Sequence, residues 1–247
     1  MKTIRMEEMN WPDVRAAIDA GYTTAVVGVG STEQHGPHLP TMTDTRIGDA
    51  TAHGVALKLG HALLARTIPI GVSAHHLAFG ATISLKPETL KMIVRDYVDS
   101  LVRDGFRRIV FLPSHGGNFT PLAEAVADAR TEHPDVEILA YTDLMGIGDF
   151  LDRVSGEFGI TPEESGMHAG ENETSLMLAL EPGLVVRERF APGYLGPMEE
   201  KEVALVFEKG MPALTENGVL GDPTKASAEK GRVYLEKMVE FFASHIH

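Results

Sequence analysis

Hydrophobic positions along the chain alternate between short continuous apolar runs and stretches with helical spacing. Continuous runs bounded by polar loops predict buried strands, and apolar positions three and four residues apart predict helices. The clearest helix covers 87–104, where Pro87 suits the first turn and Gly105 ends the pattern. The predicted strands are 24–29, 62–70, 108–112 and 136–141, and the predicted helices are 45–59, 87–104, 120–131, 173–180 and 226–243.

Strands that alternate with helices indicate an α/β fold, with a mostly parallel central sheet covered by helices on both faces. Glycine and proline are scattered and no repeat or linker stands out, so we expect one domain over 1–247. Thr43 or Asp44 is a candidate cap for the helix 45–59. Trp11, the only tryptophan, is interpreted as a packing anchor.

Polar loops follow the four predicted strands, and most of them carry histidine. Glu33 and His35 follow the first strand, and the pair His75-His76 follows the second. His115 follows the third strand and Asp143 follows the fourth. Because ligands of parallel α/β sheets bind beyond the carboxyl ends of the strands, we expect these side chains to gather at one edge.

The first group that can carry chemistry is Glu33 with His35. Residues two apart in an extended segment point the same way, so a carboxylate and an imidazole can approach metal ions together. Asp44 follows closely, and its two oxygens can bridge two cations. The alternative is that Glu33 and His35 are solvated loop residues and that Asp44 only caps a helix.

The second group is His115 with Gly116 and Gly117. Paired glycines let backbone N–H groups approach a ligand closely and stabilise a developing oxyanion. The alternative is a turn that needs a positive φ, with an ordinary histidine beside it.

The third group places His168 shortly before Glu171 and Glu173, at the start of a predicted helix. These residues can provide a metal ligand and a proton shuttle, although acids at a helix N-terminus also have a purely electrostatic explanation. Together the three groups form a His/carboxylate set that suits Zn²⁺, Mn²⁺ or Fe²⁺. Such a site would acidify a water molecule and polarise a carbonyl group.

Composition and charge exclude several classes of function for this chain. The chain has 22 basic and 35 acidic side chains, so its formal charge of −13 disfavours nucleic acid and anionic membranes as partners. The absence of cysteine excludes disulfides, thiolate nucleophiles and cysteine-based metal sites. The N-terminal segment turns acidic before any long apolar stretch, so we expect no secretory signal and a cytoplasmic protein acting on a small molecule.

Several stretches resemble the motifs of the creatininase (creatinine amidohydrolase) family. The longest is Gly30-Ser31-Thr32-Glu33-Gln34-His35-Gly36-Pro37-His38-Leu39-Pro40, followed by Thr43-Asp44, and the others are 115–118, 168–175 and 221–227. The resemblance implies an α/β fold, two divalent metal ions per subunit and a homo-oligomer, often a hexamer. It places one ion on Glu33 and His115 and the other on His35 and Glu173, bridged by Asp44, and makes His168 the proton shuttle. Zn²⁺ is the preferred ion, with Mn²⁺ or Fe²⁺ as alternatives.

The sequence departs from creatininase itself where that enzyme carries an aromatic residue, a glutamate and a tryptophan. Gly116, Gly117 and Glu164 occupy those places, so creatinine is not the expected substrate. We expect hydrolysis of a non-peptide C–N bond in a cyclic or linear amide, with His168, Glu173, Gly116 and Gly117 as catalytic residues. The alternatives are hydrolysis or isomerisation of a sugar-like or carbocyclic ketone, whose hydroxyls His75, His76 and Asp143 would contact, and a non-catalytic binding subunit.

Overall fold

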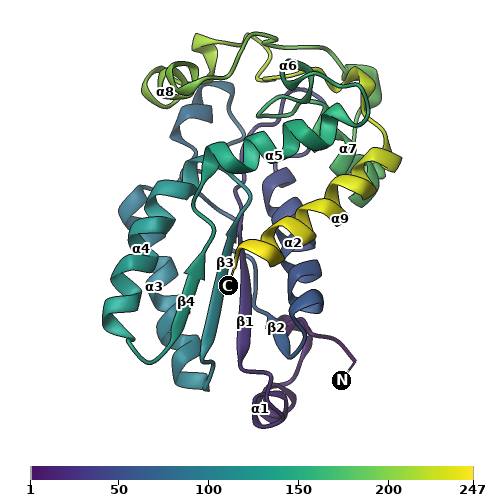
Figure 1. Ribbon diagram of the computed structural model, residues 1–247. Helices are drawn as coiled ribbons and strands as arrows, with labels where there is room; N and C mark the ends of the chain where they lie inside the picture. Colours follow the sequence, from purple (N-terminus) through teal and green to yellow (C-terminus); the bar gives the residue numbers. More distant parts are fainter. Residues whose placement is uncertain (1, 247) are drawn as a thin grey trace.

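A four-stranded parallel sheet forms the centre of the protein, in a computed structural model that describes residues 2–246 (Figure 1). The strand order is β2–β1–β3–β4, and each strand pairs in parallel with its neighbours. The strands are short and apolar because both faces of the sheet are buried. Their bounds are Thr24–Val29 (β1), Ala62–Leu64 (β2), Arg108–Pro113 (β3) and Glu137–Ala140 (β4).

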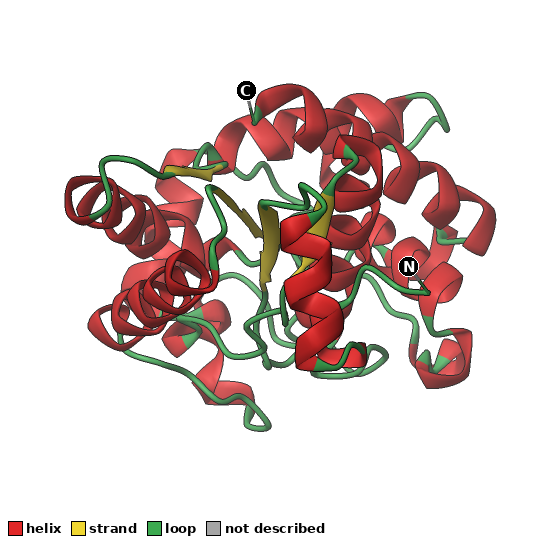
Figure 2. Ribbon diagram, turned by 90° about the horizontal axis from the view of Figure 1, so that it is seen from below, coloured by secondary structure: helices red, strands yellow, loops and turns green. Residues whose placement is uncertain are grey.

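Helices cover both faces of the sheet, as predicted (Figure 2). Successive residues of β1 point to opposite faces, so Val26 packs in one core while Ala25 and Val27 pack in the other. The Val26 core is closed by α2 (Thr43–Leu59), α7 (Glu171–Leu180) and α9 (Ala228–His245). The other core is closed by α3 (Pro87–Asp104), α4 (Phe119–Glu132) and the end of α1 (Trp11–Asp19).

Three further helices lie beyond the carboxyl ends of the strands, toward the top of Figure 1. They are α5 (Leu144–Gly156), α6 (Pro162–Ser165) and α8 (Glu200–Lys209). Two short 3₁₀ helices, η2 (Ala74–Phe79) and η3 (Gly116–Asn118), follow β2 and β3. Among the described residues, no helix is both long enough and apolar enough to cross a bilayer.

The predicted strand 62–70 is wrong in its second half. Ordered pairing ends with β2 at Leu64, and only a single parallel bridge joins Ile68 to Val29 further along. Pro69 has no N–H to donate to a ladder, which agrees with the end of pairing there. The expectation for Trp11 is also wrong, because this side chain is 81% exposed at the start of α1.

Candidate active site

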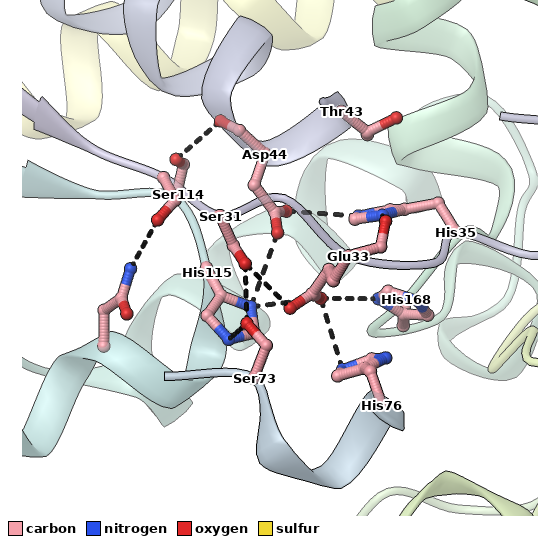
Figure 3. Close-up of polar contacts among 12 residues, drawn as sticks. Ser31, Glu33, His35, Thr43, Asp44, Ser73, His76, Ser114, His115 and His168 are labelled. Carbon is pink, nitrogen blue, oxygen red and sulfur yellow. Dashed lines mark hydrogen bonds and ion pairs between the residues drawn. The ribbon is translucent and has the colours of Figure 1, made fainter. Parts of the chain in front are cut away.

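The three sequence groups meet at the carboxyl edge of the sheet (Figure 3). Glu33 and His35 leave β1, and His115 directly follows the carboxyl end of β3. Asp44 and Glu173 lie in the first turns of α2 and α7. Glu33, His35, Asp44 and His115 are each at most 5% exposed, so the loop residues are not solvated side chains.

Asp44 lies between two histidines. Its Oδ1 is 3.2 Å from His35 Nε2, and its Oδ2 is 3.4 Å from His115 Nδ1. The helix-cap interpretation of Asp44 is wrong: α2 begins one residue earlier, and its cap position makes no side-chain hydrogen bond. Gly30 permits this placement, because a Cβ there would lie 2.6 Å from Thr45 Cα in the same helical turn.

Glu33 is surrounded by three imidazole rings. Its Oε1 is 3.2 Å from His115 Nδ1, 3.2 Å from His76 Nε2 and 3.7 Å from His168 Nδ1. None of these contacts has hydrogen-bond geometry, so this buried oxygen has no hydrogen-bond partner among the described residues. The sequence pointed to His76 only as one of two adjacent histidines after a strand, and the structure places it in the centre of the site.

Three of the histidines donate a proton to a backbone carbonyl on the side away from the carboxylates. His35 Nδ1 lies 3.1 Å from the Glu33 carbonyl oxygen, and His115 Nε2 lies 3.0 Å from that of Val72. His168 Nε2 lies 2.8 Å from the carbonyl oxygen of Gln34. The second nitrogen of each ring faces the carboxylates, and His35 Nε2 lies within hydrogen-bond distance of Asp44 Oδ1, at 3.2 Å.

Carbonyl contacts of this kind are what metal-ligating histidines usually make on their outer nitrogen. Here they turn the inner ring nitrogens toward carboxylate oxygens, an arrangement that requires a proton or a cation between each nitrogen and oxygen. The Oδ2 of Asp44, like Glu33 Oε1, is buried without a hydrogen-bond partner among the described residues. The donor set therefore fits divalent cations bound by nitrogen and oxygen.

The shifted pKa values of the site also indicate that its carboxylates require positive charge nearby. Burial opposes ionisation of Glu33, but the rings of His115 and His76 outweigh burial and hold its pKa well below the usual value. Burial lowers the pKa of His35, but Asp44 raises it more, to about 10. Burial also raises the pKa of Glu173 to about 7. Among the described residues, Glu33, Asp44 and Glu173 form ion pairs only with histidines.

Glu173 is held in place by the segment that leads into α7. Its Oε2 accepts a hydrogen bond from Ala169 N at 2.5 Å and lies 3.8 Å from His35 Nε2. Glu171, one of the candidates of the third group, points away from the site. Its carboxylate accepts hydrogen bonds from Tyr234 and Ser175 inside the contact between α7 and α9.

The two glycines after His115 have different surroundings. Gly116 lines a cavity, and an added Cβ would meet nothing closer than a Leu144 methyl at 3.8 Å. Gly117 is buried, and a Cβ there would lie 2.0 Å from the Val72 carbonyl oxygen. Asp143 is exposed, and it caps α5 by accepting a hydrogen bond from Gly146 N.

A cavity of about 320 Å³ extends from Asp44, His115, His168 and Glu173 toward α5 and α8. Its outer wall is mostly apolar and includes Leu144, Met145, Leu151, Met198, Val203 and Phe207. Asp149, Asp152 and Glu163 add negative charge, and none of the described residues that line the cavity is Lys or Arg. The cavity therefore favours apolar ligands that are neutral or cationic.

The comparison with protein families gives one match over nearly the whole chain. The creatininase family, described as creatinine amidohydrolase, matches residues 7–246. A mycofactocin precursor peptide peptidase of Mycobacterium tuberculosis is 37% identical over 87% of this chain and 81% of its own length. A creatinine amidohydrolase of Pseudomonas putida is 30% identical over 99% of this chain and 96% of its own length. A 3-dehydro-scyllo-inosose hydrolase of Thermotoga maritima is 29% identical over 87% of this chain and 74% of its own length.

Solved creatininase structures have the same fold. A creatininase variant of Zn–Zn type superposes with a TM-score of 0.83 at 29% identity, covering 100% of this chain and 98% of its own. A creatininase in its Mn form gives a TM-score of 0.82 at 29% identity, with 99% and 98% covered. The fold is thus that of creatininases solved in Zn–Zn and Mn forms.

Proposed function

Since this chain belongs to the creatininase family, we propose that it is a divalent-metal-dependent hydrolase that cleaves an amide C–N bond with an activated water molecule. The observation that carries the proposal is the set of buried imidazole nitrogens that face buried carboxylate oxygens, with outer nitrogens held by backbone carbonyls. Bound divalent ions supply Lewis acidity, which polarises a carbonyl group and lowers the pKa of water.

We assign the ligands to two ions per chain. Glu33 and His115 would hold one ion, His35 and Glu173 would hold the other, and Asp44 would be shared between them. The support is the position of Asp44, whose oxygens face the two histidines separately. Zn²⁺ is the first choice for these ligands, and Mn²⁺ or Fe²⁺ suit them too.

His168 is the proposed proton carrier. Its Nδ1 faces the site without a proton, because Nε2 donates to the Gln34 carbonyl. Burial lowers the pKa of His168 well below its usual value, and the nearby His35 and His76 lower it further, so the ring is neutral. A neutral ring can accept a proton from water and pass it to the leaving nitrogen. The backbone N–H of Gly116, at the cavity, is a candidate donor to the developing oxyanion.

The substrate we propose is an amide with an apolar body and no negative charge near the scissile bond. The support is the mostly apolar cavity wall and its carboxylates. The peptidase relative adds linear peptide-like amides to the cyclic ones. A second candidate, hydrolysis of a polyhydroxylated cyclic ketone, rests on the Thermotoga relative. It is the weaker candidate because the cavity wall is mostly apolar.

Two further expectations accompany this proposal. We expect the chain to work in the cytoplasm and to assemble into a homo-oligomer, with six subunits as the family resemblance implies. Light scattering coupled to size-exclusion chromatography measures the second, and a monomer would contradict it.

Metal analysis tests the proposed function. Protein purified without chelators is expected to bind about two divalent ions per chain, and EDTA is expected to stop hydrolysis of a panel of neutral amides. Asp44→Asn should lose bound metal and turnover together. Asp143→Asn is the matched control, since it removes the same charge from an exposed helix cap and should change neither. Protein that neither holds nor takes up metal would refute the proposal, and turnover of cyclic keto-polyols alone would favour the second candidate.

A further inference from the structure

His76 differs from the other histidines around Glu33. His35, His115 and His168 each have a backbone carbonyl on their outer nitrogen, which therefore carries the proton. The outer nitrogen of His76, Nδ1, instead lies 2.9 Å from the side-chain nitrogen of Gln34. The partner of His76 is thus a donor and not an acceptor.

The orientation of the Gln34 amide is fixed by its own contacts. Its Oε1 accepts a hydrogen bond from Gly36 N at 2.9 Å, so the other end of the amide is the NH₂ group. That NH₂ group lies 3.3 Å from the Gly218 carbonyl oxygen, which takes one of its hydrogens. The Gln34 nitrogen also lies 3.1 Å from His168 Nε2, but that ring nitrogen already donates to the Gln34 carbonyl, so the second hydrogen points to His76 Nδ1. His76 Nδ1 must then accept, and the ring carries its proton on Nε2.

We propose that Gln34 is a positioning residue that holds His76 as an N–H donor facing Glu33 and the cavity, and thereby keeps it out of the metal ligand set. His76 is 2% exposed and its ring lines the cavity. Its Nε2 is 3.2 Å from Glu33 Oε1, at an angle that makes no hydrogen bond, so the N–H group is directed past this oxygen into the site. By position alone, Glu33, His76 and His168 are close enough to hold an ion. The proton on Nε2 removes His76 from that set, since a ligating nitrogen must offer its lone pair.

Gln34 then acts on two histidines in opposite ways. The Gln34 main chain accepts a proton from His168 and leaves a base at the site, whereas its side chain donates to His76 and leaves an acid. A substitution of the side chain alters the contacts of both rings, but it keeps the carbonyl that holds the proton of His168 on Nε2 and removes the donor that faces His76. This difference separates a positioning role from general damage to the site.

Magic-angle-spinning NMR of ¹⁵N-histidine-labelled protein reads the tautomer of each ring, with assignments from the single variants His76→Gln and His168→Gln. In the wild-type chain, without metal and with Zn²⁺, His76 and His168 should both be protonated on Nε2. Gln34→Glu replaces the donor by an acceptor, so the proton of His76 should move to Nδ1 while His168 stays unchanged. Asn10→Asp, an amide-to-acid change at an exposed position, should alter neither ring. A proton on Nδ1 of His76 in the wild-type protein would overturn the inference.

A second pair of variants covers the case in which Gln34→Glu also disturbs His168. His76→Gln keeps an N–H group near the place of Nε2, and His76→Leu removes it. Loss of an outer contact to a metal ligand typically costs roughly 10- to 100-fold, so we expect that loss in kcat for His76→Leu and partial recovery for His76→Gln. Equal losses in both variants would contradict the donor role. The kinetic arm rests on the proposed function, but the NMR arm does not, so the two can fail separately.

Discussion

The contact between Tyr234 and Glu171 gives a stability prediction whose size follows from the structure. Tyr234 is fully buried in α9, and its hydroxyl donates to Glu171 Oε2 at 2.7 Å. Glu171 is itself fully buried, and it also accepts hydrogen bonds from Ser175 and Lys230. Tyr234→Phe removes one donor from a buried carboxylate and leaves the aromatic packing in place.

The expected cost of Tyr234→Phe is about 2 kcal/mol of unfolding free energy, because hydrogen bonds to charged groups contribute about 1.5–3 kcal/mol. The lower part of that range applies, since Ser175 and Lys230 still satisfy the other oxygen of Glu171. For a chain of this size the change corresponds to a fall in Tm of about 4–8 °C.

Urea unfolding followed by circular dichroism, together with calorimetry, measures the difference. Tyr194→Phe is the matched control, because its hydroxyl makes only a long contact of 3.3 Å at an exposed position. We expect the control to change stability by less than about 0.5 kcal/mol. If Tyr234→Phe were as mild as Tyr194→Phe, the buried carboxylate would not depend on this hydroxyl and the reasoning would fail.

Three further predictions concern other parts of the chain. Gly117→Ala should abolish folding or activity, because a Cβ there would lie 2.0 Å from a carbonyl oxygen. Gly116→Ala should retain folding and activity, because a Cβ there has room. Circular dichroism measures folding, and the amide assay measures activity. Burial opposes the charged form of Asp49, but hydrogen bonds from Arg5 outweigh it and lower its pKa. The contribution of the ionised Asp49 carboxylate to folding stability is therefore complete above about pH 4 and is lost as pH falls through the lowered pKa. Asp49→Asn should lower the free energy of unfolding by about 1–2 kcal/mol at pH 7 and by progressively less in acid. An equal loss of stability at all pH values would contradict this. Phe207→Ala, at the cavity wall, should raise KM for apolar amides and leave kcat unchanged in steady-state kinetics. A fall in kcat at unchanged KM would contradict this prediction.

The central part of the fold could be predicted from the sequence, because strands buried on both faces leave continuous apolar runs. The strand at 24–29 and the helix at 87–104 match the structure residue for residue. The helix Leu144–Gly156 was not predicted, and its three glycines weaken any helical signal. Packing against α9 and α6 stabilises it, and a local sequence pattern does not carry that information.

Asp44 and Glu173 lie in the first turns of helices, whereas the approach of Glu33, His35 and His115 could be predicted from their place after the strands. Their orientation could not, because it depends on carbonyl oxygens of Glu33, Val72 and Gln34 that no residue pattern marks. The division of roles between His76 and the other histidines was hidden for the same reason. It depends on whether the nitrogen or the oxygen of the Gln34 side-chain amide faces the His76 ring, and only the folded structure determines this.

The carbonyl groups that hold His35, His115 and His168 belong to the main chain, and this has a consequence for how such proteins diversify. Substitutions cannot delete a peptide oxygen, so the orientation of these rings persists as long as the strand ends keep their paths. The wall made by α5 and α8 belongs to separate segments and can change without reorienting the rings. New substrates can therefore arise by mutation of that wall while the reactive centre is inherited intact.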